Sequence, residues 1–236
     1  MKINRRRALL AGLAAAGTRV DAEQQGAPGS LYIPKAHLVE DRKFLHDFMD
    51  EFSFVDLVTA APEPRITHIP VFLDRAAGKY GTIYGHISRQ NPQSQTFDTK
   101  QPAVIVFRGP HGYISPTWYA KTDVVPTWNF AVVHASGKLR PIAERKPLLE
   151  LLGKLIDKNE DYSKSGYSFA NIPENYKFGL MAGIIGFEMQ IESLEGKFKL
   201  GQERSEADKQ GVLKNLRTAR RERSLAELTA AFYQRG

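Results

Sequence analysis

The sequence contains no cysteine among its 236 residues. This absence excludes disulfide bonds, zinc-thiolate sites, iron-sulfur clusters and thiol catalysis. The motifs of nucleotide and hydrolase chemistry are missing as well, since no Gly-x-Gly-x-x-Gly, Walker or Gly-x-Ser-x-Gly sequence occurs. Nucleotide binding by a Rossmann or P-loop motif and catalysis by a hydrolase serine are therefore unsupported.

Metal-binding patterns are also lacking. None of the six histidines belongs to a His-x-His or His-Glu-x-x-His motif or has an acidic partner at ligand spacing. The sequence therefore predicts no metal site. These histidines are His37, His46, His68, His86, His111 and His134.

Residues 1–30 resemble an export signal followed by a linker. Five cations and one carboxylate give residues 1–22 a net charge of +4, which leaves +3 of the total +7 for the rest. Arg5, Arg6 and Arg7 precede a weakly apolar run, residues 8–17, that is too short to span a bilayer. The paired arginines resemble a twin-arginine signal. We expect a periplasmic or otherwise exported protein with no integral membrane segment in the mature chain; the alternative is a cytoplasmic protein with a basic arm.

Residues 31–200 have the pattern of one mainly β (α+β) domain, and residues 201–236 that of a C-terminal helical segment. Asp41 can cap a helix that buries Phe44, Leu45 and Phe48. Strands at hairpin spacing without βαβ alternation favour an antiparallel barrel with peripheral helices. We expect Gly109 and Pro110 to end one strand, and Gly137 to interrupt another as a bulge. The predicted strands are residues 54–59, 66–73, 80–87, 103–107, 128–142 and 183–200. The last of these is either one long strand or two strands joined at Glu195 and Gly196.

Residues 84–93 (YGHISRQNPQ) predict a strand that runs into a polar turn. Ser88 offers a hydroxyl, Arg89 a fixed fork of donors and Asn91 an amide, while Pro92 prevents the strand from continuing. Arginine can bind phosphate oxygens in a bidentate fashion. This turn can therefore hold a phosphate, although a solvated surface turn has the same pattern.

Six short blocks in order resemble the PaiB-like FMN-binding proteins, over roughly residues 31–216. Such proteins are FMN-binding split β-barrels related to pyridoxamine phosphate oxidase, and they are named after a negative transcriptional regulator. The blocks are residues 31–35 (LYIPK), 67–70 (THIP), 85–93 (GHISRQNPQ), 109–116 (GPHGYISP), 125–129 (VPTWN) and 195–200 (EGKFKL).

The resemblance implies FMN as cofactor and assigns contacts to it. Ser88 and Arg89 would hold the phosphate beside Thr67 and His68, and the backbone of Ile69 and Pro70 would meet the flavin ring. Trp128 and Asn129 would lie near the ring or the ribityl chain. Lys197 and Lys199 alternate on one strand, so both should lie on one face and could stabilise a reduced flavin. His86 completes the set of residues expected to contact FMN.

The resemblance also implies a homodimer with FMN at the subunit interface. We expect flavin-dependent redox chemistry on an unknown substrate, although the residues identify no general acid or base. The competing hypothesis is a cytoplasmic, DNA-associated negative transcriptional regulator. A third hypothesis is haem binding by His86, His111 or His134, as in other split barrels.

Besides Ser88, which stands where the family often has Ala and so adds a donor, two features depart from the family pattern. Residues 201–204 (GQER) stand where the family commonly has Ser-Gln-Asn-Arg, so Glu203 would bring a carboxylate near the predicted FMN site. The family members tend to begin near the equivalent of Leu31, so residues 1–30 look added. The first departure puts FMN occupancy in question, and the second bears on localisation.

Overall fold

The computed structural model describes residues 31–60, 62–97, 101–121, 123–218 and 223–234. The predicted signal and linker, residues 1–30, lie outside the described residues. Nine strands form one sheet in the order β1-β9-β6-β5-β2-β3-β4-β8-β7, and all of the strand pairs are antiparallel. The strands are β1 (Leu38–Val39), β2 (Phe54–Thr59), β3 (Arg65–Asp74), β4 (Thr82–Ser88), β5 (Ala103–Ile114), β6 (Thr127–Gly137), β7 (Leu139–Ile142), β8 (Ile184–Gln190) and β9 (Ser193–Lys199).

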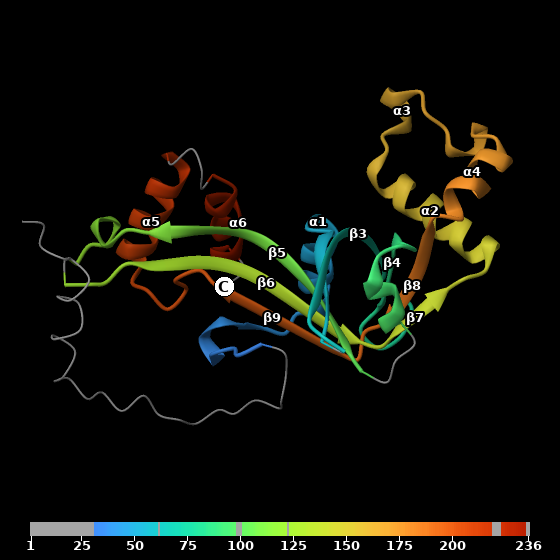
Figure 1. The fold of residues 1–236 in the computed structure, drawn as a ribbon. Helices are drawn as coiled ribbons and strands as arrows, with labels where there is room; N and C mark the ends of the chain where they lie inside the picture. The colour runs from blue at the N-terminus through green and yellow to red at the C-terminus, as the bar shows by residue number, and fades with distance from the viewer. Residues whose placement is uncertain (1–30, 61, 98–100, 122, 219–222, 235–236) are drawn as a thin grey trace, which may run out of the picture.

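Helices cover parts of this sheet (Figure 1). They are α1 (Arg42–Glu51), α2 (Arg145–Asn159), α3 (Tyr162–Ser165), α4 (Glu174–Met181), α5 (Glu206–Thr218) and α6 (Arg223–Tyr233), with 3₁₀ turns η1 (Lys35–His37), η2 (Pro92–Thr96), η3 (Pro116–Trp118) and η4 (Phe169–Asn171). The mainly β fold with peripheral helices is therefore confirmed.

The main core lies on the inner face of the sheet. Alternate strand residues point inward because successive side chains of a strand face opposite sides, and Phe107, Phe187 and Phe198 are fully buried there. Helix α1 covers part of this core with Leu45 and Phe48. The Asp41 side chain accepts a 3.0 Å hydrogen bond from the backbone N–H of Phe44. The predicted cap and buried stripe of this helix are confirmed.

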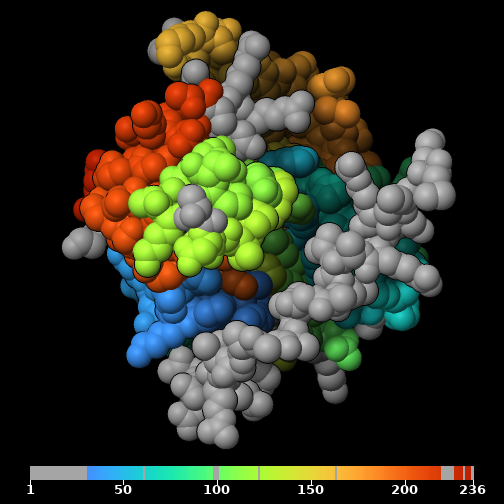
Figure 2. All heavy atoms as spheres, turned by 90° about the vertical axis from the view of Figure 1, so that its left-hand side faces the viewer, coloured from blue at the N-terminus to red at the C-terminus, as the bar shows by residue number. Residues whose placement is uncertain are grey.

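The C-terminal helices share the same core. Buried residues of α5 and α6, such as Leu216 and Ala226, belong to the cluster that fills the inner face. Helix α5 also contacts the tip of the β5–β6 hairpin, where the backbone N–H of Ala120 donates to Asp208 at 2.8 Å. Figure 2 views this end of the molecule, with α5 in orange-red beside the yellow-green hairpin tip.

A second, smaller cluster lies on the opposite face of the sheet. Leu148 and Leu151 of α2 and Met181 of α4 pack there against Phe72 and Tyr84 of β3 and β4. Figure 1 shows α2 and α4 together at the end of the sheet that holds β4, β8 and β7. These helices therefore cover only one part of the outer face.

Three strand predictions were wrong. Residues 183–200 form two strands, β8 and β9, and the break between them lies at residues 191–192 and not at Glu195 and Gly196. Strand β5 does not end at Gly109 and Pro110 but runs through them to Ile114, with a register shift between Arg108 and His111. The shift lets the strand absorb a proline, which cannot donate to the ladder.

The predicted long strand of residues 128–142 is two strands. β6 pairs with β5 and β9, whereas β7 pairs with β8. A Cβ atom on Gly137, at the end of β6, would lie 2.3 Å from the backbone oxygen of Gln190. The chain therefore changes partners at Gly137, where another strand approaches too closely for a side chain.

Candidate functional site

The outer face of the sheet is open over β2, β5, β6 and β9 and the first half of β3, and we call this surface the open face. Large apolar side chains lie exposed on it: Phe54 is 69% exposed, Ile66 61%, Trp128 54% and Tyr113 43%. Tyr113 and Trp128 pair across β5 and β6 in an edge-to-face arrangement, with ring centroids 6.2 Å apart. Such a surface is typical of a binding site.

The polar turn follows β4 as predicted. Arg89 donates from Nε to the carbonyl of Ala182 at 3.2 Å and from Nη2 to that of Ile184 at 2.9 Å. Its Nη1 makes no hydrogen bond within the part of the chain that the structure describes. Ser88 Oγ accepts from the backbone N–H of Gln90 at 3.2 Å, so its hydroxyl proton stays available. An oriented guanidinium edge and a hydroxyl thus lie on consecutive residues, which is a donor set that fits a phosphate.

Asn91 does not face outward as a ligand but ties the turn to β3. Its Nδ2 donates to Thr67 Oγ1 at 2.9 Å, and its Oδ1 accepts from the backbone N–H of Gln93 at 3.0 Å. The Thr67 hydroxyl in turn donates to the side-chain oxygen of Gln93. Thr67 therefore contributes its hydroxyl to this network, which positions Ser88 and Arg89.

Gln93 is the most buried polar residue of this region, at 0% exposure. Its Nε2 contacts the carbonyl of Leu57 at 3.1 Å and the hydroxyl of Thr59 at 3.2 Å. Sequence reasoning missed this role, because the pattern places Gln93 in a polar turn and contains no sign of its burial.

His68 lies on the open face, unlike its neighbour Thr67. Its Nδ1 is 2.6 Å from Asp56 Oδ1 across β2 and β3, and Arg108 donates to the other carboxylate oxygen. Burial raises the pKa of Asp56, but the bonds from Arg108 and His68 outweigh it, so the pKa lies below its ordinary value. The sequence pattern did not suggest this cluster, because its members come from three strands that are distant in sequence.

His86 lies on the outer side of β4, at the border between the open face and the covered part. Its Nδ1 is buried and has no hydrogen-bond partner within the described residues. Burial lowers the pKa of His86, so the ring is neutral at pH 7. An unpaired buried nitrogen two residues before Ser88 is consistent with a site that takes a polar ligand. On β3, Ile69 is buried in the main core and Pro70 is exposed.

Trp128 and Asn129 lie on opposite sides of β6. Trp128 is exposed on the open face, whereas Asn129 is 3% exposed and lies near Gly201 and Tyr119 on the inner side. Consecutive strand residues cannot share one face. Of these two residues, the structure therefore places only Trp128 on the open face, where His68 also lies.

Lys197 and Lys199 share one face of β9, as their spacing predicts. Lys197 Nζ donates to the carbonyl of Tyr32 at 2.7 Å and lies 5.4 Å from the Tyr32 ring and 5.6 Å from the Phe130 ring. Burial, aided by the charge of Lys199, lowers the pKa of Lys197. Lys199 donates to the hydroxyl of Thr127 at 2.6 Å. Two cations therefore lie at the β9 side of the open face.

Glu203 lies at the β9 end of the molecule and not at the Ser88–Arg89 turn. Its Oε2 is 3.9 Å from His37 Nε2, and its Oε1 is 4.0 Å from Arg204 Nε. Within one chain, its carboxylate therefore has one cationic neighbour, Arg204, because burial lowers the pKa of His37.

Comparisons with known proteins assign the family. A model described as "Putative FMN-binding domain" matches residues 31–193. The Protease synthase and sporulation protein PAI 2 of Bacillus subtilis is 33% identical over 187 residues, which cover 79% of this chain and 89% of that protein. This chain belongs to the PaiB-like FMN-binding family. FMN is the cofactor of the family. A second relative, the uncharacterised protein AN0679 of Emericella nidulans, is 28% identical, and the match covers 78% of this chain and 89% of that protein.

Solved structures show the same fold at low identity. The flavocytochrome Anf3 of Azotobacter vinelandii superposes with a TM-score of 0.54 at 12% identity, over 71% of this chain and 72% of that one. A protein of Bacteroides thetaiotaomicron described as a "putative 5-nitroimidazole antibiotic resistance protein" superposes with a TM-score of 0.50 at 10% identity. The match covers 68% of this chain and 85% of that one. This chain therefore has a split β-barrel fold, as predicted.

Within the described residues, no helix is long and apolar enough to cross a membrane. The same part of the chain contains no group of three or more histidine or acidic side chains that could hold a metal ion.

Proposed function

We propose that two copies of this chain bind FMN between their open faces and that the holoprotein is an oxidoreductase for a small substrate. The observation that carries the proposal is the open face itself, which combines exposed aromatic and aliphatic side chains with the cations Arg108, Lys197 and Lys199. An uncovered apolar surface of this kind is typical of a subunit interface.

The positions of the predicted contacts support a site shared between two copies. Ser88 ends β4 and Arg89 follows it, whereas Lys197 and Lys199 belong to β9, which lies five places away in the sheet order. Five strand spacings amount to about 24 Å along the sheet. The two groups therefore lie on separate parts of the sheet of one chain, and a second copy that supplies one of them would let both contact the same cofactor.

When bound, FMN supplies the hydride or electron transfer, and the protein supplies position and electrostatics. Arg89, held by the carbonyls of Ala182 and Ile184, and Ser88 would bind the phosphate of one FMN. Trp128 would provide an apolar surface for a ring. Lys197 would place a positive charge where it stabilises an anionic cofactor.

Complementation between two variants tests this arrangement. Arg89→Ala removes the phosphate ligand, and Lys197→Met removes the cation while keeping the length of the side chain. In a mixed dimer, one interface site then carries both substitutions and the other carries neither. Dimers purified through two different tags are all mixed dimers, so they should bind FMN at about half of the wild-type number of sites, measured by flavin absorbance.

The same experiment can contradict the proposal. Failure of the mixed dimers to bind FMN, while each variant is folded and dimeric, would show that Arg89 and Lys197 do not come from different copies. Arg140→Ala, on the exposed edge strand β7, is the matched control for loss of an arginine. It should leave FMN binding unchanged.

We also infer that the chain is exported with its cofactor through a twin-arginine route. The support is the run Arg5-Arg6-Arg7 ahead of a weakly apolar segment. A fusion of residues 1–30 to a reporter that is active only outside the cytoplasm should be exported, and Arg5, Arg6 and Arg7 replaced by Lys should block this. Retention of the unaltered fusion in the cytoplasm would contradict export and would remove the argument against the regulatory alternative.

A further inference from the structure

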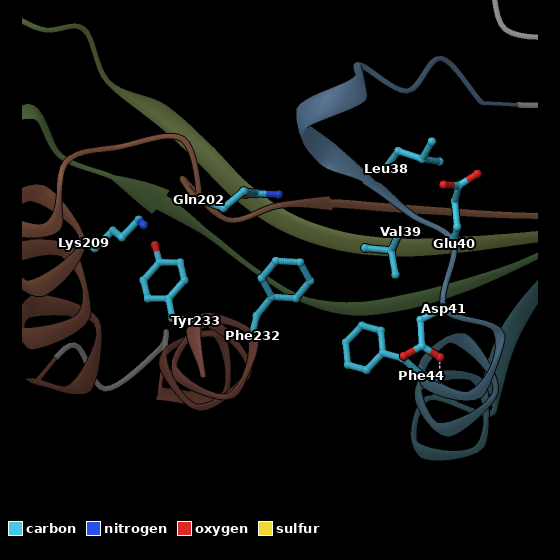
Figure 3. Close-up of a pocket in the computed structure, with 9 residues that line it drawn as sticks. All are labelled: Leu38, Val39, Glu40, Asp41, Phe44, Gln202, Lys209, Phe232 and Tyr233. Carbon is cyan, nitrogen blue, oxygen red and sulfur yellow. Dashed lines mark hydrogen bonds between the residues drawn. The ribbon is translucent and has the colours of Figure 1, made fainter. Parts of the chain in front are cut away.

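A hollow of about 460 Å³ lies between β1, the start of α1, α5 and the end of α6. Figure 3 shows its two ends and its middle. Lys209 and Tyr233 lie together at one end, Phe232 and Phe44 occupy the middle, and Glu40 and Asp41 lie at the other end. A volume of this size is within the usual range of small-molecule sites.

The middle of the hollow has rigid aromatic walls. The ring centroids of Phe44 and Phe232 are 6.0 Å apart, and both rings pack on the buried Phe198, at 5.1 and 5.7 Å. Val39 adds an aliphatic wall from the edge strand. Side chains that are fixed against the main core lose little entropy when they bind a ligand, so these walls are suited to an apolar, ring-sized group.

The side-chain amide of Gln202, which also lines the hollow, is already hydrogen-bonded to the protein. Gln202 accepts from the backbone N–H of Leu200 at 2.9 Å, and its Nε2 donates to the carbonyls of Ala36 and Phe198 at 2.8 and 2.6 Å. The Tyr233 hydroxyl donates its proton to the carbonyl of Leu200 at 2.6 Å. Polar recognition at this end of the hollow therefore depends on Lys209.

Lys209 presents a positioned ammonium group. Its Nζ lies 5.4 Å from the Tyr233 ring, and its ion-pair partner is Glu206, whose Oε2 is 4.0 Å away. That contact is longer than a hydrogen bond, and the Glu206 side chain is 74% exposed to water. Among the residues that the structure describes, no group accepts a hydrogen bond from the Lys209 ammonium, so its donors can bind an anionic ligand.

The carboxylates limit the charge of such a ligand. Asp41 caps α1, and Glu40 is exposed beside it. Together they disfavour a second negative charge at their end of the hollow. We propose that the hollow is a second binding site that takes an aromatic monocarboxylate, with the carboxylate on Lys209 and the ring packed against Phe44 and Phe232.

This site is separate from the proposed FMN surface. Phe44 and Phe232 pack on Phe198, which points to the inner side of β9, whereas Lys197 and Lys199 point to the outer side. The proposal therefore does not depend on FMN, and loss of either site should leave the other intact.

The probe for a test is 3-phenylpropionate, titrated by calorimetry into the full chain. We expect saturable binding of one molecule per chain, weakened roughly ten-fold or more in Lys209→Met, because a charge-assisted hydrogen bond is lost. Lys214→Met is the matched control, since Lys214 is an exposed lysine of the same helix, and it should bind like wild type. 3-Phenylpropylamine, which carries the opposite charge, should bind more weakly than the acid.

Three outcomes would overturn the proposal. They are no saturable binding of 3-phenylpropionate, equal affinity in wild type and a folded Lys209→Met, or tighter binding of the amine than of the acid. Thermal melting of each variant and its FMN content separate a lost site from a lost fold. Wild-type FMN content in Lys209→Met is expected.

Discussion

Asn91 Nδ2 donates a 2.9 Å hydrogen bond to Thr67 Oγ1 and thereby joins the turn after β4 to strand β3. Gln93 also fixes this turn, because its buried amide group forms hydrogen bonds with the carbonyl of Leu57 and the hydroxyls of Thr59 and Thr67. The geometry of Ser88 and Arg89 therefore depends on a buried amide two residues beyond the hydrogen-bonding asparagine.

Replacing Gln93 by Leu should destabilise the protein by about 2–3 kcal/mol, because buried polar groups lose their partners. Urea unfolding without FMN measures the free energy, since bound FMN would add its own stabilisation. The exposed Gln90→Leu is the control and should stay within about 0.5 kcal/mol of wild type. Equal stability of the two variants would show that the Gln93 network does not hold the turn.

Gly137 and Gly153 should respond in opposite directions to alanine. A Cβ at Gly137 would lie 2.3 Å from the backbone oxygen of Gln190, whereas one at Gly153, within α2, meets nothing within 4 Å. Gly137→Ala should cost about 1–3 kcal/mol by overpacking, and Gly153→Ala should stabilise by roughly 0.5–1 kcal/mol through helix propensity. Thermal and urea unfolding measure both changes. An unchanged free energy of unfolding in Gly137→Ala would contradict this account of the close approach.

Stability should fall as the pH drops below about 6.5, the ordinary pKa of histidine. Burial lowers the pKa of His86 in the folded chain, so below that pH the unfolded chain binds more protons than the folded one and acid favours unfolding. His86→Met should reduce this slope between pH 7 and 5. Some slope should remain, because burial also lowers the pKa of His37 and His134.

Urea unfolding at several pH values measures the slope. The control is His111→Met, since His111 is exposed. If the slope were unchanged in His86→Met and reduced in His111→Met, the account of the acid sensitivity would be wrong, because His111 and not His86 would be its source.

The sequence predicted the elements that depend on local chemistry. Asp41 caps its helix through its own side chain, and the hairpin of β2 and β3 follows from two β-rich runs around a proline-containing turn. The alternation that puts Lys197 and Lys199 on one face is also a local property.

The sequence could not predict features that depend on which strands become neighbours. The sequence suggested a bulge at Gly137, because it could not show that Gln190, about fifty positions later in the chain, lies against this glycine. The contact of Asp56 with His68 and Arg108 requires the order β3-β2-β5. The separation of Arg89 from Lys197 follows from the same sheet order, which no short motif contains.

The central claim is that this chain binds FMN through the turn after β4. The most direct measurement is the absorbance spectrum of the purified protein, followed by titration of the apoprotein with FMN. We predict flavin bands, saturation at one FMN per chain, and affinity weakened roughly ten- to a hundred-fold in Arg89→Ala but not in Arg140→Ala. A colourless protein that ignores added FMN, or an Arg89→Ala variant that binds FMN like wild type, would contradict the account.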